Sequence, residues 1–233
     1  VLWGRSLYQN IQRFLLFQLT VNVAACFLVL AGSFMGTDAP LTVTQMLWVN
    51  LIMDTFGAMA LSSLPPSNKV MQNKPRDRHA FIINKPMAQN ILGVGGFFFI
   101  LLLVILYICE HADITCMKDF ITTSVGARNG LTPYEHTLIF SIFVMTHFWY
   151  MFNARAFETG QSAFHFKGCN GFGLISLIIV VGQILIVEVL YNFFNVVPMK
   201  IEDWIIIVIL SSLVLFVREG WHLITKNAIK GNN

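Results

Sequence analysis

The chain alternates long apolar stretches with short polar segments. Six apolar stretches approach the roughly 20 residues that an α-helix needs to cross the hydrocarbon core of a bilayer. They cover residues 14–34, 41–61, 91–109, 134–152, 171–191 and 204–221. We therefore expect an all-α integral membrane protein, in which residues 1–233 form a single transmembrane domain, a bundle of six transmembrane helices.

Local signals predict two helix boundaries. Pro65 and Pro66 each lack a backbone N–H and clash with the preceding turn, so the second helix must end before them. The segment Thr132-Pro133-Tyr134-Glu135 has the pattern of a capping box with proline at the first helical position. It predicts the start of the fourth helix.

The distribution of cationic residues predicts the orientation. Six spans put both termini on one side of the membrane, together with the polar loop 62–90. Of the 15 lysines and arginines, only Lys118, Arg128 and Lys200 fall on the other side. By the positive-inside rule, both termini and loop 62–90 are cytoplasmic. Cys109 and Cys116 then lie outside, where a disulfide between them is sterically possible.

Composition agrees with a membrane protein and limits its chemistry. Hydrophobic residues make up 56% of the chain and charged residues 12%, whereas soluble domains carry about 25% charged residues. The net charge of +3 does not suggest a nucleic-acid partner. The chain has no GxxxxGK[ST] phosphate loop and no DKTG-like phosphorylation sequence. We therefore expect no catalytic or cofactor-binding residue in this chain, and no ATP-hydrolysing site. Since there is no initiator methionine or signal peptide, we expect a longer parent protein.

Three polar side chains in the first two predicted spans are candidates for an ion site. Asp54 is the only acidic residue deep in any span, on the order of 11 Å from the cytoplasmic end of its helix. Asn50 lies one helical turn further out on the same face. Asn22, on the first helix, is roughly 12 Å deep, and Gln18 lies one turn below it. A charge near the bilayer centre costs roughly 2.5–3.5 kcal/mol on insertion scales, so Asp54 is a functional candidate.

These side chains offer the ligands that Ca²⁺ prefers, but too few of them. Ca²⁺ takes about 6–8 oxygen ligands from carboxylates, carbonyls and amides. We predict that Asn22, Asn50 and Asp54 are metal ligands, with the remainder supplied by water or by helices outside this chain. The alternative is that the amides join helices through hydrogen bonds, with Asp54 protonated. Elsewhere we expect His147 to be a packing residue and Glu188 to reach the outer interface.

Longer motifs give these residues a family context. The segments Gly4–Ile11 and Phe17–Val23 resemble the start of the fifth transmembrane helix of type II P-type ATPases. The segment Gln45–Asp54 resembles the sixth helix of these pumps, and Leu64–Pro66 resembles its exit. The likeness is strongest over residues 3–86 and continues, mainly as topology, through helices five to ten. Within the family, the sequence is most similar to type IIB, plasma-membrane calcium pumps.

The resemblance implies a function and a set of partners. It implies the membrane half of an ATP-driven calcium-export pump in the plasma membrane (the inner membrane of a bacterial cell), and a bacterial origin fits. The missing N-terminal half would supply helices one to four, the cytoplasmic domains with their aspartyl-phosphate cycle, and the sites for ATP and Mg²⁺. Pumps of the reticulum type have a second calcium site with two glutamates, where this chain has Ala25 and His147. The resemblance therefore implies one site, to which Asn22, Asn50 and Asp54 belong.

Two other classes of function stay open at the level of the sequence. One is a gradient-driven secondary cation transporter or channel, complete in itself. Such proteins often show inverted repeats and helices broken by glycine or proline, whereas this chain has no evident repeat. The other is a fragment that packs in the membrane without transporting ions.

Overall fold

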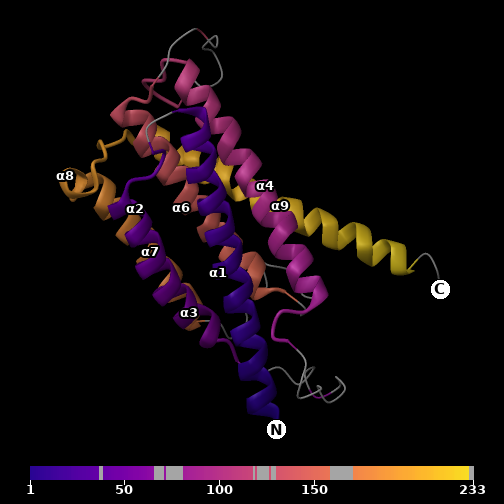
Figure 1. Cartoon of the computed structure of the whole chain (residues 1–233). Helices are drawn as coiled ribbons and strands as arrows, with labels where there is room; N and C mark the ends of the chain where they lie inside the picture. The colour runs from indigo at the N-terminus through magenta and orange to yellow at the C-terminus, as the bar shows by residue number, and fades with distance from the viewer. Residues whose placement is uncertain are drawn as a thin grey trace.

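The structure consists of helices and their connections. The computed structural model describes residues 1–36, 39–65, 71, 81–117, 119, 126, 130–157 and 170–230, and the backbone alone for residues 52–54 and 217–230. Pro66, Lys118 and Arg128 lie outside these residues. The α-helices are α1 (Leu2–Met35), α2 (Val43–Trp48), α3 (Asp54–Ser62), α4 (Lys85–His111), α6 (Pro133–Arg155), α7 (Asn170–Glu188), α8 (Tyr191–Phe194) and α9 (Ile201–Lys230), and η1 (Val49–Met53) is a π-helix. The expected all-α bundle is confirmed for this part of the chain (Figure 1).

Among the described residues, four helices are long and apolar enough to cross a membrane. They are α1, α4, α6 and α7, which contain the first, third, fourth and most of the fifth predicted spans. The second predicted span is divided into α2, η1 and α3. The sixth lies within α9, whose C-terminal part extends away from the other helices (Figure 1). The count of six spans therefore stays a prediction.

Side-chain hydrogen bonds show that the helices alternate in direction. At the end of the bundle where the chain begins, Gln12 Nε2 on α1 donates to the carbonyl of Ile82, just before α4, at 2.9 Å. At the same end, Arg13 Nε donates to the carbonyl of Phe157, just after α6, at 3.5 Å. At the opposite end, Gln45 Nε2 on α2 donates to the carbonyl of Phe194 on α8, at 3.1 Å. Helices α1 and α4 thus begin at the end where α6 finishes.

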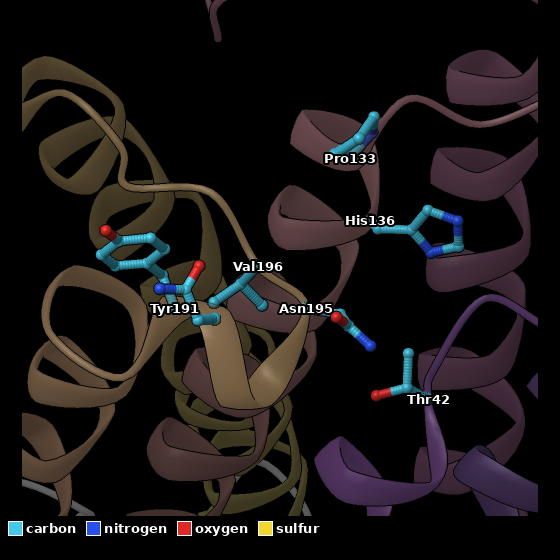
Figure 2. Close-up of a pocket in the computed structure, with 7 residues that line it drawn as sticks. Thr42, Pro133, His136, Tyr191, Asn195 and Val196 are labelled. Carbon is cyan, nitrogen blue, oxygen red and sulfur yellow. The ribbon is translucent and has the colours of Figure 1, made fainter.

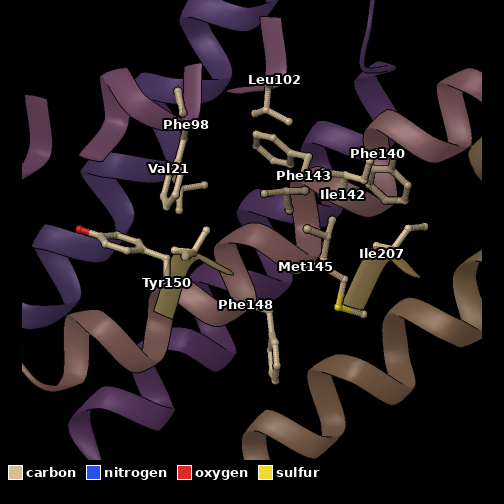
Figure 3. Close-up of a cluster of buried hydrophobic side chains, with 14 of the residues drawn as sticks. Val21, Phe98, Leu102, Phe140, Ile142, Phe143, Met145, Phe148, Tyr150 and Ile207 are labelled. Atoms are coloured by element: carbon tan, nitrogen blue, oxygen red, sulfur yellow. The ribbon is translucent and has the colours of Figure 1, made fainter. Parts of the chain in front are cut away.

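Helix α6 forms the centre of the bundle. In its apolar window, 94% of the residues are buried, against 28–39% in α1, α4 and α7. Figure 3 shows Phe143 and Phe148 of α6 among side chains of neighbouring helices, including Phe98 of α4 and Ile207 of α9. This position explains why the fourth predicted span is the most polar. Because protein surrounds α6, its polar side chains do not face lipid.

Local capping begins the helices as the sequence predicts. The Thr132 side chain accepts from Glu135 N at 3.3 Å, and Glu135 Oε2 accepts from Thr132 N at 2.6 Å, which confirms the predicted capping box. A second capping box, between Thr42 and Gln45, starts α2. Helix α3 ends at Ser62, before the Leu64-Pro65 step, as proline requires.

Carboxylates at the far end of the bundle hold loop backbone. Glu135 Oε1 accepts from Ile114 N at 3.1 Å, and Asp203 Oδ1 accepts from Met117 N at 3.0 Å. Glu188 Oε1 accepts from Trp204 Nε1 at 3.0 Å and from Met199 N at 3.2 Å. Glu188 is half-buried, and its side chain joins α7 to α9; its expected place at the outer interface stays a prediction. Cys109 and Cys116 are both free thiols in the structure.

Candidate ion site at the interrupted helix

Asn22 lies on the flank of α1. The face of α1 toward the bundle is buried and includes Phe17, Val21, Ala24 and Leu28. Asn22 is only half-buried, beside this face. An amide at this depth can therefore still reach a partner outside the described residues.

Helices α1 and α3 approach each other closely near the predicted site. A Cβ atom added to Gly57 would come within 3.0 Å of Phe17 Cε1, so only glycine fits this contact without a shift of the ring. Asn22 lies five residues beyond Phe17 on α1, or about 7.5 Å along the axis, and Asp54 lies three residues before Gly57, or about 4.5 Å. Because the two helices are antiparallel, the backbones of Asn22 and Asp54 differ in depth by only about 3 Å.

The π-helix η1 interrupts the second predicted span at the candidate ligands. Asn50 lies within η1, and Asp54 is the first residue of α3. The expectation of an unbroken α-helix through these residues was wrong, and the prediction that Asn50 and Asp54 share one face stays a prediction. Single π-helical turns inside α-helices are rare and are frequent at functional sites.

Asn50 is exposed in the structure. Hydrocarbon offers no hydrogen-bond partner. An amide left unpaired there costs on the order of several kcal/mol, as does any buried polar group without a hydrogen bond. The side chain of Asp54 lies outside the described residues. The structure thus brings the backbones of α1 and α3 together, and the ligand roles of Asn22, Asn50 and Asp54 stay predictions.

His147 lies elsewhere, in the aromatic core of the bundle. Its side chain is fully buried, and Nδ1 donates to the carbonyl of Phe143, one turn earlier on α6. Its ring contacts those of Phe143 and Phe98, with centroids 4.2 and 5.3 Å apart. Ala25 is also buried in this hydrophobic cluster. The resemblance implies that a second calcium site is lost at Ala25 and His147. Both residues are packed against apolar side chains, and His147 is a packing residue, as expected.

Sequence reasoning missed a hydrogen-bonded network between α1, α4 and α6. The Tyr150 hydroxyl donates to Asn90 Oδ1 at 3.1 Å and lies 3.2 Å from Thr20 Oγ1. The Tyr150 ring also stacks on Phe17, with centroids 6.2 Å apart. Polar residues scattered over three helices give no short-range signal that they meet. Buried tyrosines do require a partner for their hydroxyl, which is the one available clue.

A groove of about 390 Å³ opens at the far end of the bundle. It is lined by Thr42, Pro133, His136, Tyr191, Asn192, Asn195 and Val196. In Figure 2, Thr42, His136 and Asn195 surround the opening from three different segments. No carboxylate lines the groove, so it lacks the anionic ligands of a calcium site. Among the described residues, no group of three or more histidines, cysteines, aspartates and glutamates could hold a metal ion.

Comparison with known proteins identifies the family. Residues 38–224 match the family described as "Cation transporting ATPase, C-terminus". This match covers most of the chain, and the chain therefore belongs to the cation-transporting ATPases, in which it corresponds to the C-terminal membrane region.

Within this class, the relatives are plasma-membrane calcium pumps. The chain is 37% identical over 212 residues to plasma membrane calcium-transporting ATPase 2 of Oreochromis mossambicus, covering 88% of this chain and 18% of the relative. It is 36% identical over 218 residues to calcium-transporting ATPase 4, plasma membrane-type, of Arabidopsis thaliana, covering 92% of this chain and 20% of the relative. It is 36% identical over 210 residues to plasma membrane calcium-transporting ATPase 3 of Homo sapiens, covering 88% of this chain and 16% of the relative. The resemblance to type IIB pumps is confirmed.

The chain matches only part of the length of each relative. The chain spans between 16% and 20% of the length of these relatives. The relatives come from a fish, a plant and a mammal, so they give no support to the expected bacterial origin.

Proposed function

We propose that this chain is the membrane half of an ATP-driven calcium-export pump of the plasma membrane. The observation that carries the proposal is the likeness to plasma-membrane calcium-transporting ATPases over 88–92% of the chain. On this proposal Ca²⁺ is the transported ion. The phosphorylation domain and the sites for ATP and Mg²⁺ belong to the missing N-terminal half of the full-length pump.

We further propose that Asn22, Asn50 and Asp54 supply part of one calcium site near the bilayer midplane. Three features support it: the close approach of α1 and α3 at Gly57, the similar depth of Asn22 and Asp54, and the π-helix that contains Asn50. The remaining oxygen ligands come from water and from helices of the N-terminal half, since Ca²⁺ takes about 6–8 ligands. The exposure of Asn50 leaves room for such a helix.

The topology completes the proposal. All six predicted helices cross the membrane, α2, η1 and α3 together forming the second span, and both termini face the cytoplasm. The alternating helix directions support it, as does the placement of only Lys118, Arg128 and Lys200 on the outer side. Cysteines substituted at Lys74 and Lys226 should be labelled from the opposite side to one at Lys118 in sealed vesicles. Labelling of all three from one side would contradict the topology.

The proposed function is tested with the full-length protein in inside-out vesicles. ATP should drive Ca²⁺ uptake that persists when ion gradients are collapsed, and Ca²⁺ should be required for phosphorylation of the protein by ATP. Uptake that needs a gradient and no ATP would instead indicate a secondary transporter or channel. No uptake under either condition, from a folded full-length protein, would indicate a membrane protein without calcium-transport function.

A further inference from the structure

The cytoplasmic third of α1 carries buried polar side chains that the ion site does not use. Ser6, Asn10, Gln12 and Arg13 are only 5–6% exposed. A buried cation and buried amides are costly unless hydrogen bonds satisfy them. Their hydrogen bonds therefore show what this part of α1 holds.

Asn10 and Arg13 bind the chain just beyond two other helices. Asn10 Nδ2 donates to the carbonyls of Leu64 and Ser62, at 3.3 and 3.5 Å. Arg13 Nη1 donates to Asn10 Oδ1 at 2.9 Å, and Arg13 Nε donates to the carbonyl of Phe157 at 3.5 Å. We call these two side chains and three carbonyls the Asn10–Arg13 clamp. It joins α1 to the ends of α3 and α6.

The clamp holds the opposite end of the helix that begins with Asp54. Helix α3 has nine residues, or about 13 Å of axial length, and it follows η1 directly. The contact between Gly57 and Phe17 fixes α3 laterally against α1, but it does not fix α3 along its axis. Helix α3 also packs against α7. The clamp adds an attachment at the C-terminal end of α3, which restrains its depth relative to α1.

We propose that Asn10 and Arg13 are positioning residues, which set the depth of Asp54 relative to Asn22 by holding the end of α3 to α1. This inference rests on the proposed calcium site. Neither side chain touches the ion. A change in the clamp alters calcium affinity through the placement of α3 and leaves the chemistry of phosphorylation intact.

Asn10→Asp keeps the hydrogen bond from Arg13 and removes the bonds to Ser62 and Leu64. The aspartate still accepts the Arg13 hydrogen bond, but an oxygen replaces Nδ2 and faces the carbonyl oxygens of Ser62 and Leu64. Ser6→Ala is the matched control, because Ser6 lies one turn earlier on α1, is equally buried, and its hydroxyl has no hydrogen-bond partner in the described structure. Gln12→Leu is a second control, since Gln12 holds Ile82 before α4 and not α3.

The test is phosphorylation of the full-length pump by ATP as a function of free Ca²⁺. The maximum reports how much pump is folded, and the midpoint reports calcium affinity. Asn10→Asp should raise the midpoint by roughly tenfold, the effect of leaving a buried polar group unpaired, with an unchanged maximum. Arg13→Lys should shift it in the same direction by less, because an ammonium cannot reproduce the fork that reaches both Asn10 and Phe157. Both controls should keep the wild-type midpoint.

The outcomes separate the inference from the proposed function. A wild-type pump whose phosphorylation does not depend on Ca²⁺ would overturn the proposed function. A calcium-dependent wild type with an unshifted midpoint in Asn10→Asp would overturn the positioning role. If Asn10→Asp lowers the maximum because it folds poorly, Arg13→Lys decides: an unshifted midpoint there overturns the role as well.

Discussion

The core around α6 and the candidate ion site on α1 and η1 differ in how far they bury their polar side chains. Around α6, polar side chains such as Ser141, Thr146 and His147 are buried inside the bundle. Two of its side chains bond to α9: Trp149 Nε1 donates to Ser211 Oγ at 3.1 Å, and Asn153 Nδ2 donates to the carbonyl of Val214 at 3.0 Å. Along α1 and η1, Asn22 is half-buried and Asn50 is exposed. The first region keeps its polar side chains inside the bundle, and the second presents two amides toward its surface.

The difference bears on where a membrane protein can accept an irregular helix. An interrupted helix at membrane depth is tolerated where it is buried in protein or lines a polar site. The core around α6 needs no such break, and its helix runs without interruption from Pro133 to Arg155. The calcium site proposed above therefore falls at the interrupted helix, and the aromatic core around α6 serves as the scaffold in that proposal.

The largest effect is expected for Asp54→Asn. This change removes the only acidic residue that lies deep in any of the predicted spans, so calcium-dependent phosphorylation of the full-length pump should be lost while the protein stays inserted. Neutralising a charge in the membrane does not destabilise the fold. Thr55→Val, at the exposed neighbouring position, is the control and should keep wild-type phosphorylation. Unchanged calcium dependence in Asp54→Asn would place the ion site elsewhere.

Asn50→Ala should weaken calcium affinity without abolishing it. It removes one neutral oxygen ligand, and the midpoint for calcium-dependent phosphorylation should rise by roughly tenfold, as for one lost bond to a charged group. Leu51→Ala changes an exposed side chain of the same π-helix and should leave the midpoint unaltered. Equal midpoints for the two variants would show that Asn50 is not a ligand.

Gly57→Ala should separate α1 from α3 slightly. The new methyl group would lie 3.0 Å from Phe17 Cε1, and this overpacking should cost about 1–3 kcal/mol of stability. The calcium midpoint should rise by less than in Asn50→Ala. Gly93→Ala is the matched control, since a Cβ atom there meets nothing within 4 Å. A thermal denaturation scan in which both variants melt alike would contradict the close approach.

The smallest effect is expected for His147→Leu. Leucine has a similar volume and loses one hydrogen bond to Phe143, so stability should change by less than about 1.5 kcal/mol. The calcium midpoint should not move, because His147 lies in the scaffold. A shift as large as that of Asn50→Ala would show that the ion site extends into the aromatic core.

Local sequence signals predicted helix ends better than helix interiors. The capping box at Thr132 and Glu135 and the stop before Pro65 each depend on a few adjacent residues, and both are confirmed. The π-helix at Val49–Met53 could not be foreseen, because this segment has neither glycine nor proline and its apolar residues suit an α-helix equally well.

Hydrogen bonds between residues far apart in the chain could not be predicted from the sequence, for a different reason. The bond from Asn10 to Leu64 joins α1 to the chain after α3, and that from Glu188 to Trp204 joins α7 to α9. Helix spacing predicts which face a residue shares, but not which helix packs against that face. For the candidate site, the sequence predicted depth, and the structure adds the contact between Phe17 and Gly57.

Equilibrium binding of Ca²⁺ to the purified full-length pump is the most direct test of the division between ion site and scaffold. Binding should be measured for the wild type, Asp54→Asn and His147→Leu under the same conditions, without ATP. The wild type and His147→Leu should bind Ca²⁺ with the same stoichiometry and affinity, and Asp54→Asn should bind none at this site. Retained binding in Asp54→Asn, or its loss in His147→Leu from a folded protein, would contradict the account.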